Sequence, residues 1–293
     1  MNSKTILITG VTGFLGSHLV RMLLKNNYKL IGIKRATSSF YRISDIAENI
    51  TWYTTEKTDL LNIFQNHKID TILHCATDYG RKTTNPLSTL EANLILPLEL
   101  LDIASNAGVK TFINTDTILD KRINNYTLSK KHFYEWLRTY SSRILCINIA
   151  LEHFYGPYDD QSKFITFIIK SLLNNEKEIK LTLGEQKRDF IYIDDVVEAF
   201  LALMVKTDRY KKGLHHFEIG SGTVISIADI VRMTKELCGN TKTKLKFGAL
   251  PYRKNEVMES KVNLKPLLSL GWSPKTSLKN GLKKTIEIER SIL

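Results

Sequence analysis

The sequence predicts an α/β protein with a doubly wound parallel sheet, and two observations support that prediction. Five short apolar runs have the length of buried strands, at 5–9, 29–34, 70–74, 110–115 and 144–149. Helical patterns lie between them, as at 86–106 and 124–140. Strands that alternate with helices form parallel sheets, because each helix returns the chain to the same edge of the sheet.

The first strand runs directly into a glycine-rich turn and a helix, in ILITGVTGFLGSH (6–18). Gly10 permits the turn, Gly13 lets the backbone approach a pyrophosphate, and Gly16 lets the helix pack closely on the strand. The helix N-terminus then offers unpaired N–H groups to the phosphates. This context favours a Rossmann-type dinucleotide site over a glycine-rich surface turn. Its expected cofactor contacts are Gly10, Thr12, Gly13, Phe14, Leu15 and Gly16.

The second strand ends in Lys34 and Arg35, in KLIGIKRATSS. An acidic residue at this place binds the ribose hydroxyls of NAD, whereas a cation suits the 2′-phosphate of NADP. The sequence therefore favours NADP(H) as cofactor. The alternative is that both residues are solvated surface cations.

Tyr126 and Lys130 lie four residues apart within a helical pattern, which puts both side chains on one face of the helix. An ammonium near a phenol is expected to lower the phenol pKa and equip it for acid–base work. Upstream, the strand in FINTDTIL ends at Thr115, Asp116 and Thr117, so a hydroxyl beside the phenol is expected from Thr115 or Thr117. By itself, each of these features is equally compatible with ordinary surface or turn residues.

After about residue 150 the pattern loosens. Helices are expected near 162–174, 194–206, 226–238 and 275–293, with a short strand at 243–248. We predict a dinucleotide-binding domain at 1–155 that also takes parts of 185–225. A smaller C-terminal α/β domain, for the substrate, is predicted at 156–184 and 226–293.

Composition excludes several classes of protein. The chain has 293 residues, and no apolar run approaches the ~18–20 residues of a membrane span. No signal peptide is evident, so a cytoplasmic protein is expected. The three cysteines lie far apart without a CxxC pair, which favours reduced thiols over disulfides or a metal site. The formal net charge of +12 is dispersed along the chain, which fits an anionic substrate better than nucleic acid.

The chain resembles the extended short-chain dehydrogenase/reductase family in the order of three features. These are the glycine loop, the hydroxyl-bearing strand end and the YxxxK motif of Tyr126 and Lys130. The resemblance covers essentially the whole chain. It implies that Tyr126 is the proton donor or acceptor, that Lys130 holds the ribose and tunes Tyr126, and that Thr115 takes the place of the family's Ser or Thr. It also implies cofactor contacts by Asp59, Leu60, Cys75, Ala76, Thr77 and Asn93. Many members form dimers through paired helices, so a homodimer through 86–106 and 124–140 is expected.

Longer fragments resemble one branch of that family, the nucleotide-sugar 4-ketoreductases that make CDP-abequose and CDP-paratose for bacterial O-antigen. They include HCATDYG (74–80), IALEHFYGPYDDQSKF (149–164) and LTLGEQKRDFIYIDD (181–195). This resemblance implies reduction of a 4-keto sugar on CDP, or on dTDP, by NADPH. The family resemblance places Arg188 and Arg253 where the substrate's diphosphate is gripped. Thr117 is a further substrate candidate, as the second hydroxyl of the strand end. Asp78, Tyr79, Arg81 and Lys163 are also candidates, for which an ordinary solvated loop or helix position is equally compatible.

The sequence departs from the dehydratases of the family at one informative position. Those enzymes carry an Asp-Glu pair after the strand threonine, but here Thr117 follows Asp116. Dehydration therefore lacks one of its two carboxylates. An NAD-dependent 4-epimerase of a nucleotide sugar is the nearest rival function. A non-catalytic protein that senses NADP(H) is more remote, because this chain keeps both Tyr126 and Lys130.

Overall fold

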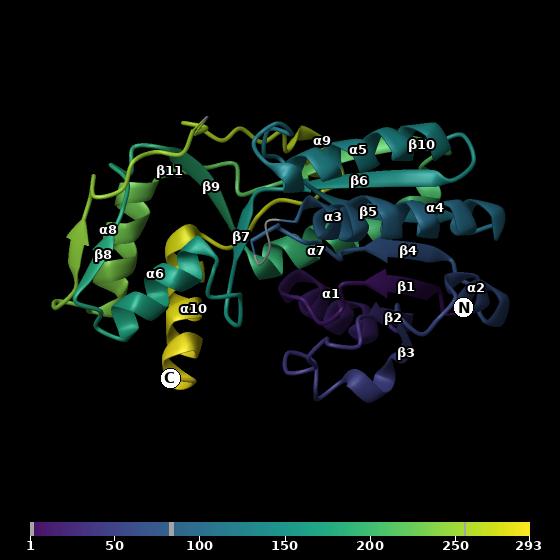
Figure 1. The fold of residues 1–293 in the computed structure, drawn as a ribbon, viewed down its shortest axis with the longest axis horizontal. Helices are drawn as coiled ribbons and strands as arrows, with labels where there is room; N and C mark the ends of the chain where they lie inside the picture. Colours follow the sequence, from purple (N-terminus) through teal and green to yellow (C-terminus); the bar gives the residue numbers. More distant parts are fainter. Residues whose placement is uncertain (1–2, 82–84, 255) are drawn as a thin grey trace. The chain divides into compact units, whose positions relative to one another are not determined.

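The predicted parallel sheet is present in the computed structural model, which describes residues 3–81, 85–254 and 256–293 (Figure 1). Seven strands lie in the order β10-β6-β5-β4-β1-β2-β3. Their bounds are β1 Thr5–Thr9, β2 Lys29–Lys34, β3 Thr51–Thr54, β4 Thr71–His74, β5 Thr111–Thr117, β6 Leu145–Leu151 and β10 Gly213–Ile219. From β1 the chain moves outward through β2 and β3, then returns to β4 on the other side of β1 and continues to β5 and β6, all in parallel. This order confirms a doubly wound fold, whose point of reversal lies between β1 and β4.

Helices connect these strands and supply the other half of the core. They are α1 Phe14–Lys25, α2 Leu60–Asn66, α3 Pro86–Leu90, α4 Leu96–Asn106 and α5 Asn125–Tyr140, with single 3-10 turns η1 Ala47–Asn49 and η3 Thr207–Arg209. Helices α4 and α5 pack against each other. Phe133 of α5 meets Phe112 of β5, and both rings are fully buried. Burial of this apolar layer against the sheet holds the helices that carry the site.

The glycine loop folds as tightly as its sequence predicts. A Cβ on Gly10, whose φ is +70°, would lie 2.6 Å from the Ala76 nitrogen. A Cβ on Gly16 would lie 2.1 Å from the Gly10 carbonyl oxygen. Neither position leaves room for a side chain, so both glycines are required for the turn between β1 and α1.

A π-helical turn, η2 (Glu91–Ile95), joins α3 to α4. Pro97 lies just after it and has no N–H to give to the Asn93 carbonyl, so the regular helical ladder is interrupted there. The turn directs the fully buried Asn93 side chain toward the segment after β4. Its Nδ2 donates to the Asp78 carbonyl (2.8 Å) and its Oδ1 accepts from the Asp78 N–H (2.9 Å).

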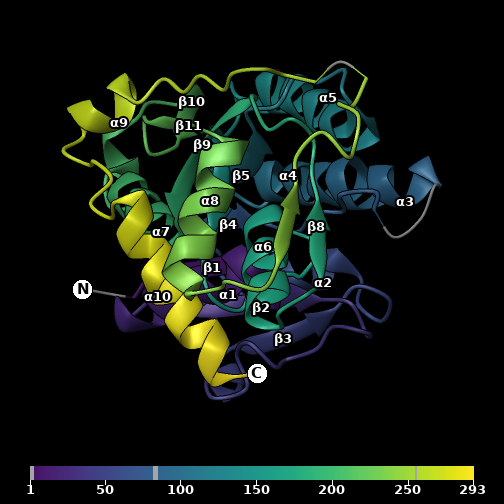
Figure 2. The same cartoon turned by 90° about the vertical axis from the view of Figure 1, so that its left-hand side faces the viewer.

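The remainder of the chain forms a second compact unit, residues 152–199 and 219–293. It contains a three-stranded sheet of β11 (Val224–Ser226), β9 (Lys187–Tyr192) and β7 (His153–Tyr155), and a two-stranded sheet of β12 (Lys244–Lys246) and β8 (Glu178–Lys180). Its helices are α6 Phe164–Leu173, α8 Ile227–Cys238, α9 Lys265–Ser269 and α10 Leu278–Ser291. Figure 2 shows α6, α8 and α10 side by side, and the three pack against one another.

The first unit comprises residues 1–151 and 200–218. Its returning segment, 200–218, lies within 185–225, the range of which parts were expected from sequence. Strand pairing explains its extent: β10 joins the edge of the seven-stranded sheet beside β6, whereas β9 pairs with β7 and β11. Helix α7 (Ile193–Met204) carries the chain from one unit to the other. Among the described residues, no helix is long and apolar enough to cross a membrane.

Candidate active site

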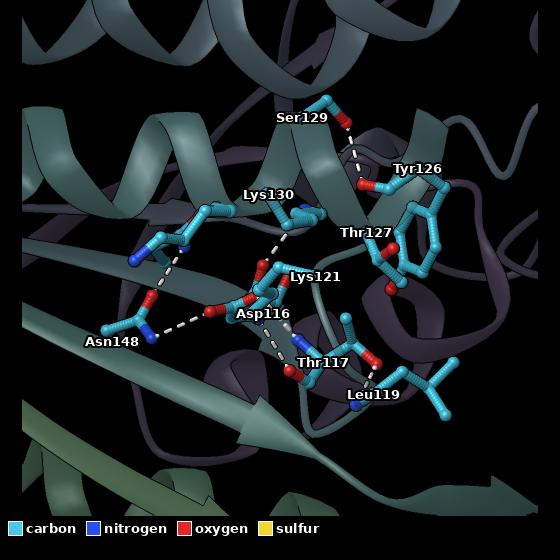
Figure 3. Close-up of polar contacts among 12 residues, drawn as sticks. Asp116, Thr117, Leu119, Lys121, Tyr126, Thr127, Ser129, Lys130 and Asn148 are labelled. Atoms are coloured by element: carbon cyan, nitrogen blue, oxygen red, sulfur yellow. Dashed lines mark hydrogen bonds and ion pairs between the residues drawn. The ribbon is translucent and has the colours of Figure 1, made fainter. Parts of the chain in front are cut away.

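Tyr126 lies in the first turn of α5, and local sequence fixes where that helix begins. Asn124 caps the helix by accepting a hydrogen bond from the Thr127 N–H (2.9 Å), and the Thr127 hydroxyl accepts in return from the Asn124 N–H (3.2 Å). This reciprocal pair is a capping box. It sets the position of Tyr126 at the carboxyl end of β5, where Figure 3 shows the ring beside Thr117 and Thr127.

The phenol of Tyr126 has a pKa well above its usual value of 10. Burial is the largest cause, and Tyr79 and the Asp116 carboxylate raise the pKa further. A hydrogen bond from Thr117 and the charge of Arg81 act in the opposite direction. The expectation that a neighbouring ammonium brings this pKa down is therefore wrong here, because desolvation of the phenolate prevails. At neutral pH the phenol carries its proton and is equipped to donate it.

Lys130 lies one helical turn beyond Tyr126 and is fully buried. Its Nζ donates to the Thr115 carbonyl oxygen at 2.9 Å (Figure 3). Burial lowers the pKa of Lys130 to about 8, with a further lowering by Lys121, while Asp116 and Cys75 raise it. The ammonium is thus held beneath the end of β5, and its pKa of about 8 lies close to physiological pH.

The two candidate hydroxyls have different surroundings. Thr115 is buried, and its hydroxyl donates to the His74 carbonyl on β4 at 3.0 Å. The Thr117 hydroxyl accepts from the Leu119 N–H (3.3 Å) and hydrogen-bonds the Tyr126 phenol. The first choice made from sequence, Thr115, therefore fastens two strands together, and Thr117 is the hydroxyl beside the phenol. The side-chain period of two puts these residues on one face, so only their hydrogen-bond partners distinguish them.

Asp116 is almost completely buried between these two threonines. Its Oδ1 accepts from Lys121 Nζ (2.6 Å) and from the Thr117 N–H (2.7 Å), and its Oδ2 accepts from Asn148 Nδ2 (3.1 Å). Figure 3 shows this carboxylate at the centre of the polar contacts below Tyr126 and Lys130. The carboxylate is ion-paired and fully engaged, which suits a fixed anion better than a proton donor.

The segment after β4 is fixed from beneath by Thr9. The Thr9 hydroxyl accepts from the Cys75 N–H (3.2 Å) and the Ala76 N–H (3.1 Å), and it bonds His74 Nδ1 (2.8 Å). Burial lowers the pKa of His74 well below 6.5 and raises that of the Cys75 thiol to about 12, so both are neutral. The segment therefore presents a defined backbone wall beside the glycine loop.

The glycine loop has the features that a dinucleotide requires. Gly10 and Gly16 form a cradle that any Cβ would fill. The first turn of α1, all of which the structure describes, has no side-chain cap and no acidic residue, so its N–H groups and positive dipole favour a phosphate. Phe14 and Leu15 point into the core, which makes their contribution one of backbone. Thr12 is joined to the next loop by Arg42, whose Nη1 donates to the Thr12 carbonyl (3.3 Å).

Basic residues lie at the carboxyl end of β2, where the sequence predicts a contact to a 2′-phosphate. Lys34 is half-buried with its Nζ 5.3 Å from the centre of the Phe40 ring, and Arg35 is exposed. Glu56 lies close by: it accepts from the Ala36 N–H (3.0 Å), and its pKa is lowered mainly by backbone hydrogen bonding, with a smaller effect from Arg35. Arg42 adds a third cation to this loop, which the sequence did not reveal.

Asp59 and Leu60, both expected to contact the cofactor, have evident structural tasks. Asp59 caps α2 by accepting from the Leu61 N–H (3.0 Å), and Leu60 is buried in the core. Asn93, also expected at the cofactor, fastens the segment after β4 to α5, since its Nδ2 also donates to the Ser129 hydroxyl (3.0 Å).

The loop after β4 brings aromatic and charged groups to the phenol. The Tyr79 ring lies 5.0 Å from the Tyr126 ring, and the Arg81 guanidinium lies 5.3 Å from the Tyr79 ring. The Asp78 carboxylate accepts from the Gly80 N–H (2.8 Å) and shapes the turn. These three substrate candidates therefore lie around Tyr126 in the same unit of the protein.

The other substrate candidates lie in the second unit. Arg188 on β9 is buried, donates to the Lys187 carbonyl (2.8 Å), and forms a short ion pair with Glu256. Arg253 is exposed in the segment before Glu256, and Lys163 is the residue that precedes α6. His153, on the neighbouring strand β7, is in register with Phe190, and its Nδ1 lies 3.0 Å from Glu152. An anion that binds Arg188 has to share it with the Glu256 carboxylate.

Two residues near the site were not predicted from the sequence. Lys121 and Arg42 belong to no recognisable motif and reach the site only because loops fold back on it. Among the described residues, no group of His, Cys, Asp and Glu could hold a metal ion.

Comparisons with known proteins agree with this geometry. The chain matches the NAD dependent epimerase/dehydratase family over residues 6–220. It is 35% identical to CDP-abequose synthase of Salmonella muenchen over 98% of both chains, and 27% identical to UDP-glucuronate 4-epimerase of Thermodesulfobacterium geofontis over 96% of this chain and 94% of that one. Among solved structures, UDP-glucose 4-epimerase of Thermotoga maritima in complex with UDP-glucose superposes with a TM-score of 0.86, at 26% identity over 98% of this chain and 99% of that one. The chain therefore belongs to the NAD dependent epimerase/dehydratase family.

Proposed function

We propose that the protein uses NADPH to reduce the C4 keto group of a CDP-linked deoxy- or 3,6-dideoxy-4-hexulose. The observation that carries the proposal is the Tyr126 phenol, which hydrogen-bonds Thr117 at the carboxyl end of β5, one helical turn before the buried Lys130. Similarity to CDP-abequose synthase along nearly the whole chain supports the substrate class.

Each residue has a definite task in this reaction. Bound NADPH would supply the hydride to C4 of the sugar. Tyr126 gives its proton to the oxygen that becomes an alkoxide, and Thr117 donates a hydrogen bond there. Lys130 holds the nicotinamide ribose and keeps a positive charge beneath the phenol. Arg188 and Arg253 are proposed to bind the diphosphate, because guanidinium groups match its oxygens in bidentate fashion.

The cofactor end of the site argues against the rival 4-epimerase. Epimerisation returns its hydride within one turnover and needs no net reductant, whereas a ketoreductase consumes one NADPH for each sugar. Lys34 and Arg35 suit the phosphorylated cofactor that biosynthetic reductions use.

We also propose a homodimer through the helical segments 86–106 and 124–140. Four of their apolar side chains are more than two-fifths exposed: Leu87 in α3, Ile95 in η2, and Leu128 and Trp136 in α5. Exposed apolar side chains on neighbouring helices suit contact with a second copy.

A panel of ketosugars tests the proposed function. Purified protein with NADPH is given CDP- and dTDP-linked 4-keto sugars and the free 4-keto sugar, and loss of the nicotinamide absorbance is followed. We expect the CDP-linked sugar to give the highest kcat/KM, and the free sugar to be at least about 100-fold poorer, because binding energy at the diphosphate positions the carbonyl. Equal turnover of free and nucleotide-linked sugar would contradict the proposal.

A further inference from the structure

Lys121 joins the strand end to the loop that follows it. Its Nζ donates to Asp116 Oδ1 at 2.6 Å and to the Thr117 carbonyl oxygen at 2.7 Å (Figure 3). The Asp116 side chain is 2% exposed and that of Lys121 26%, so this ion pair is largely withdrawn from water. The carboxylate is shielded from water and the lysine side chain is partly exposed, so solvent screens this pair only in part.

We propose that Lys121 is a positioning residue for the proton donor, because it ties Asp116 to Thr117 and so holds the Thr117 hydroxyl against Tyr126. The inference rests on the proposed function, in which Tyr126 gives the proton. It assigns a task to a residue other than the threonines, Tyr126 and Lys130. Lys121 lies in the loop after β5, directly after Ile118-Leu119-Asp120.

The contacts of Asp116 support this task. Both of its oxygens accept hydrogen bonds, from Lys121, from the Thr117 N–H and from Asn148. Asn148 is itself held, because its Oδ1 accepts from Asn114 Nδ2 at 2.7 Å. The carboxylate is therefore clamped on both sides of the strand end. Removal of the ammonium alone would leave a buried anion without its counter-charge, and the Thr117 backbone would lose one of its anchors.

The pair is also electrically coupled to Lys130. The charge of Asp116 raises the pKa of Lys130 and that of Lys121 lowers it, and burial together with these charges sets it at about 8. The other titratable groups that face Lys130 are His74 and Cys75 on the β4 side, which are neutral near this pH.

Tyr126 senses the same carboxylate. Asp116 raises the pKa of its phenol, Tyr79 raises it as well, and Arg81 lowers it. Since this pKa lies well above 10, the ionisation that can be observed near pH 8 belongs to Lys130. A change in the charge of the Asp116–Lys121 pair should therefore shift the pH at which a property that depends on charged Lys130 begins to change. This pH is called the break below.

The test measures how NADPH binding depends on pH, by cofactor fluorescence, in four variants. Lys130 must carry its charge to hold the ribose, so the dissociation constant should rise above pH ~8 in the wild type. In Lys121→Met a repulsive charge is lost, the pKa of Lys130 rises, and the break should move upward by about half to one pH unit. In Asp116→Asn the break should move downward. Lys121→Arg should keep it in place, and Lys131→Met, an exposed helix lysine paired with Glu135 at 2.7 Å, controls for net charge.

Turnover gives the second readout. We expect Lys121→Met to lower kcat by about 10- to 100-fold with KM for the nucleotide sugar within twofold, and Lys121→Arg to restore most of it. The inference would be overturned if the break fell at the same pH in the wild type, in Lys121→Met and in Asp116→Asn. It would also be overturned if kcat of Lys121→Arg were as low as that of Lys121→Met. NADPH binding needs no turnover, so a wild type that binds NADPH but reduces no ketosugar would count against the proposed function instead.

Discussion

Tyr126→Phe should lower kcat by about 10²- to 10⁴-fold while the dissociation constant of NADPH stays nearly unchanged. The substitution keeps the ring, which lies 5.0 Å from that of Tyr79, and removes only the hydroxyl that gives the proton. A loss of this size follows because the alkoxide formed at C4 would have to take its proton from water. Steady-state kinetics and cofactor fluorescence measure the two quantities.

Tyr134→Phe is the matched control, two turns further along α5. The Tyr134 ring lies 5.9 Å from that of His216 and takes no part in the proposed chemistry, so its variant should retain kcat within about twofold. Near-wild-type turnover by Tyr126→Phe would show that another group supplies the proton. An equal loss in both variants would point to damage of α5 and not to proton transfer.

Replacement of Lys34 by Asp together with Arg35 by Ser should weaken NADPH binding by about 2–3 kcal/mol, roughly 30- to 150-fold in dissociation constant. The reason is loss of charge-assisted contacts to the 2′-phosphate, which NADH does not have. Binding of NADH should therefore change little, and the preference for NADPH should be lost. Arg42, joined to the glycine loop at Thr12, remains in this variant, so part of the attraction for the 2′-phosphate of NADPH should remain.

Lys25→Ser with Lys29→Asp is the matched control for charge. Both lysines are exposed, and Lys29 begins β2 whereas Lys34 ends it. This variant should keep both dissociation constants within about twofold. Equal weakening of NADPH and NADH by the Lys34 and Arg35 substitutions would show that these residues shape the loop and do not bind a phosphate.

Local patterns predicted most of the first unit. The five apolar runs became β1, β2, β4, β5 and β6 within a residue or two, because buried parallel strands are nearly continuous apolar segments. The strand β3 was missed since its sequence, TWYT, is short and only partly buried. The edge strand β10 was missed for a related reason: GLHHFEI has two histidines and only two buried residues, Phe217 and Ile219, so its pattern does not distinguish it from a loop.

In the candidate site, the sequence predicts relations between neighbouring residues but not the hydrogen-bond partners that the fold brings together. YxxxK places Tyr126 and Lys130 correctly on one helix face, because that relation is local. Three-dimensional partners decide the rest: Thr115 and Thr117 share a face of the strand, but His74 engages the first and Tyr126 the second. Lys121 reaches Asp116 through a loop without a recognisable pattern.

The second unit gives a similar lesson. Arg188 was expected from sequence to grip a diphosphate, and it lies buried on β9. The sequence did not predict that Glu256, sixty-eight residues later, would already neutralise that guanidinium. Charge pairs between distant segments depend on the whole fold, whereas glycine loops and helix caps depend on a few neighbouring residues.

Transfer of deuterium from NADPH that carries deuterium at both C4 positions of the nicotinamide tests the central claim most directly. The labelled cofactor is incubated with the CDP-linked 4-keto sugar, and the product is examined by mass spectrometry and NMR. Net reduction predicts one deuterium at C4 of the sugar and one NADP⁺ formed for each sugar reduced. Interconversion of C4 epimers without consumption of NADPH, or a product without deuterium at C4, would contradict it.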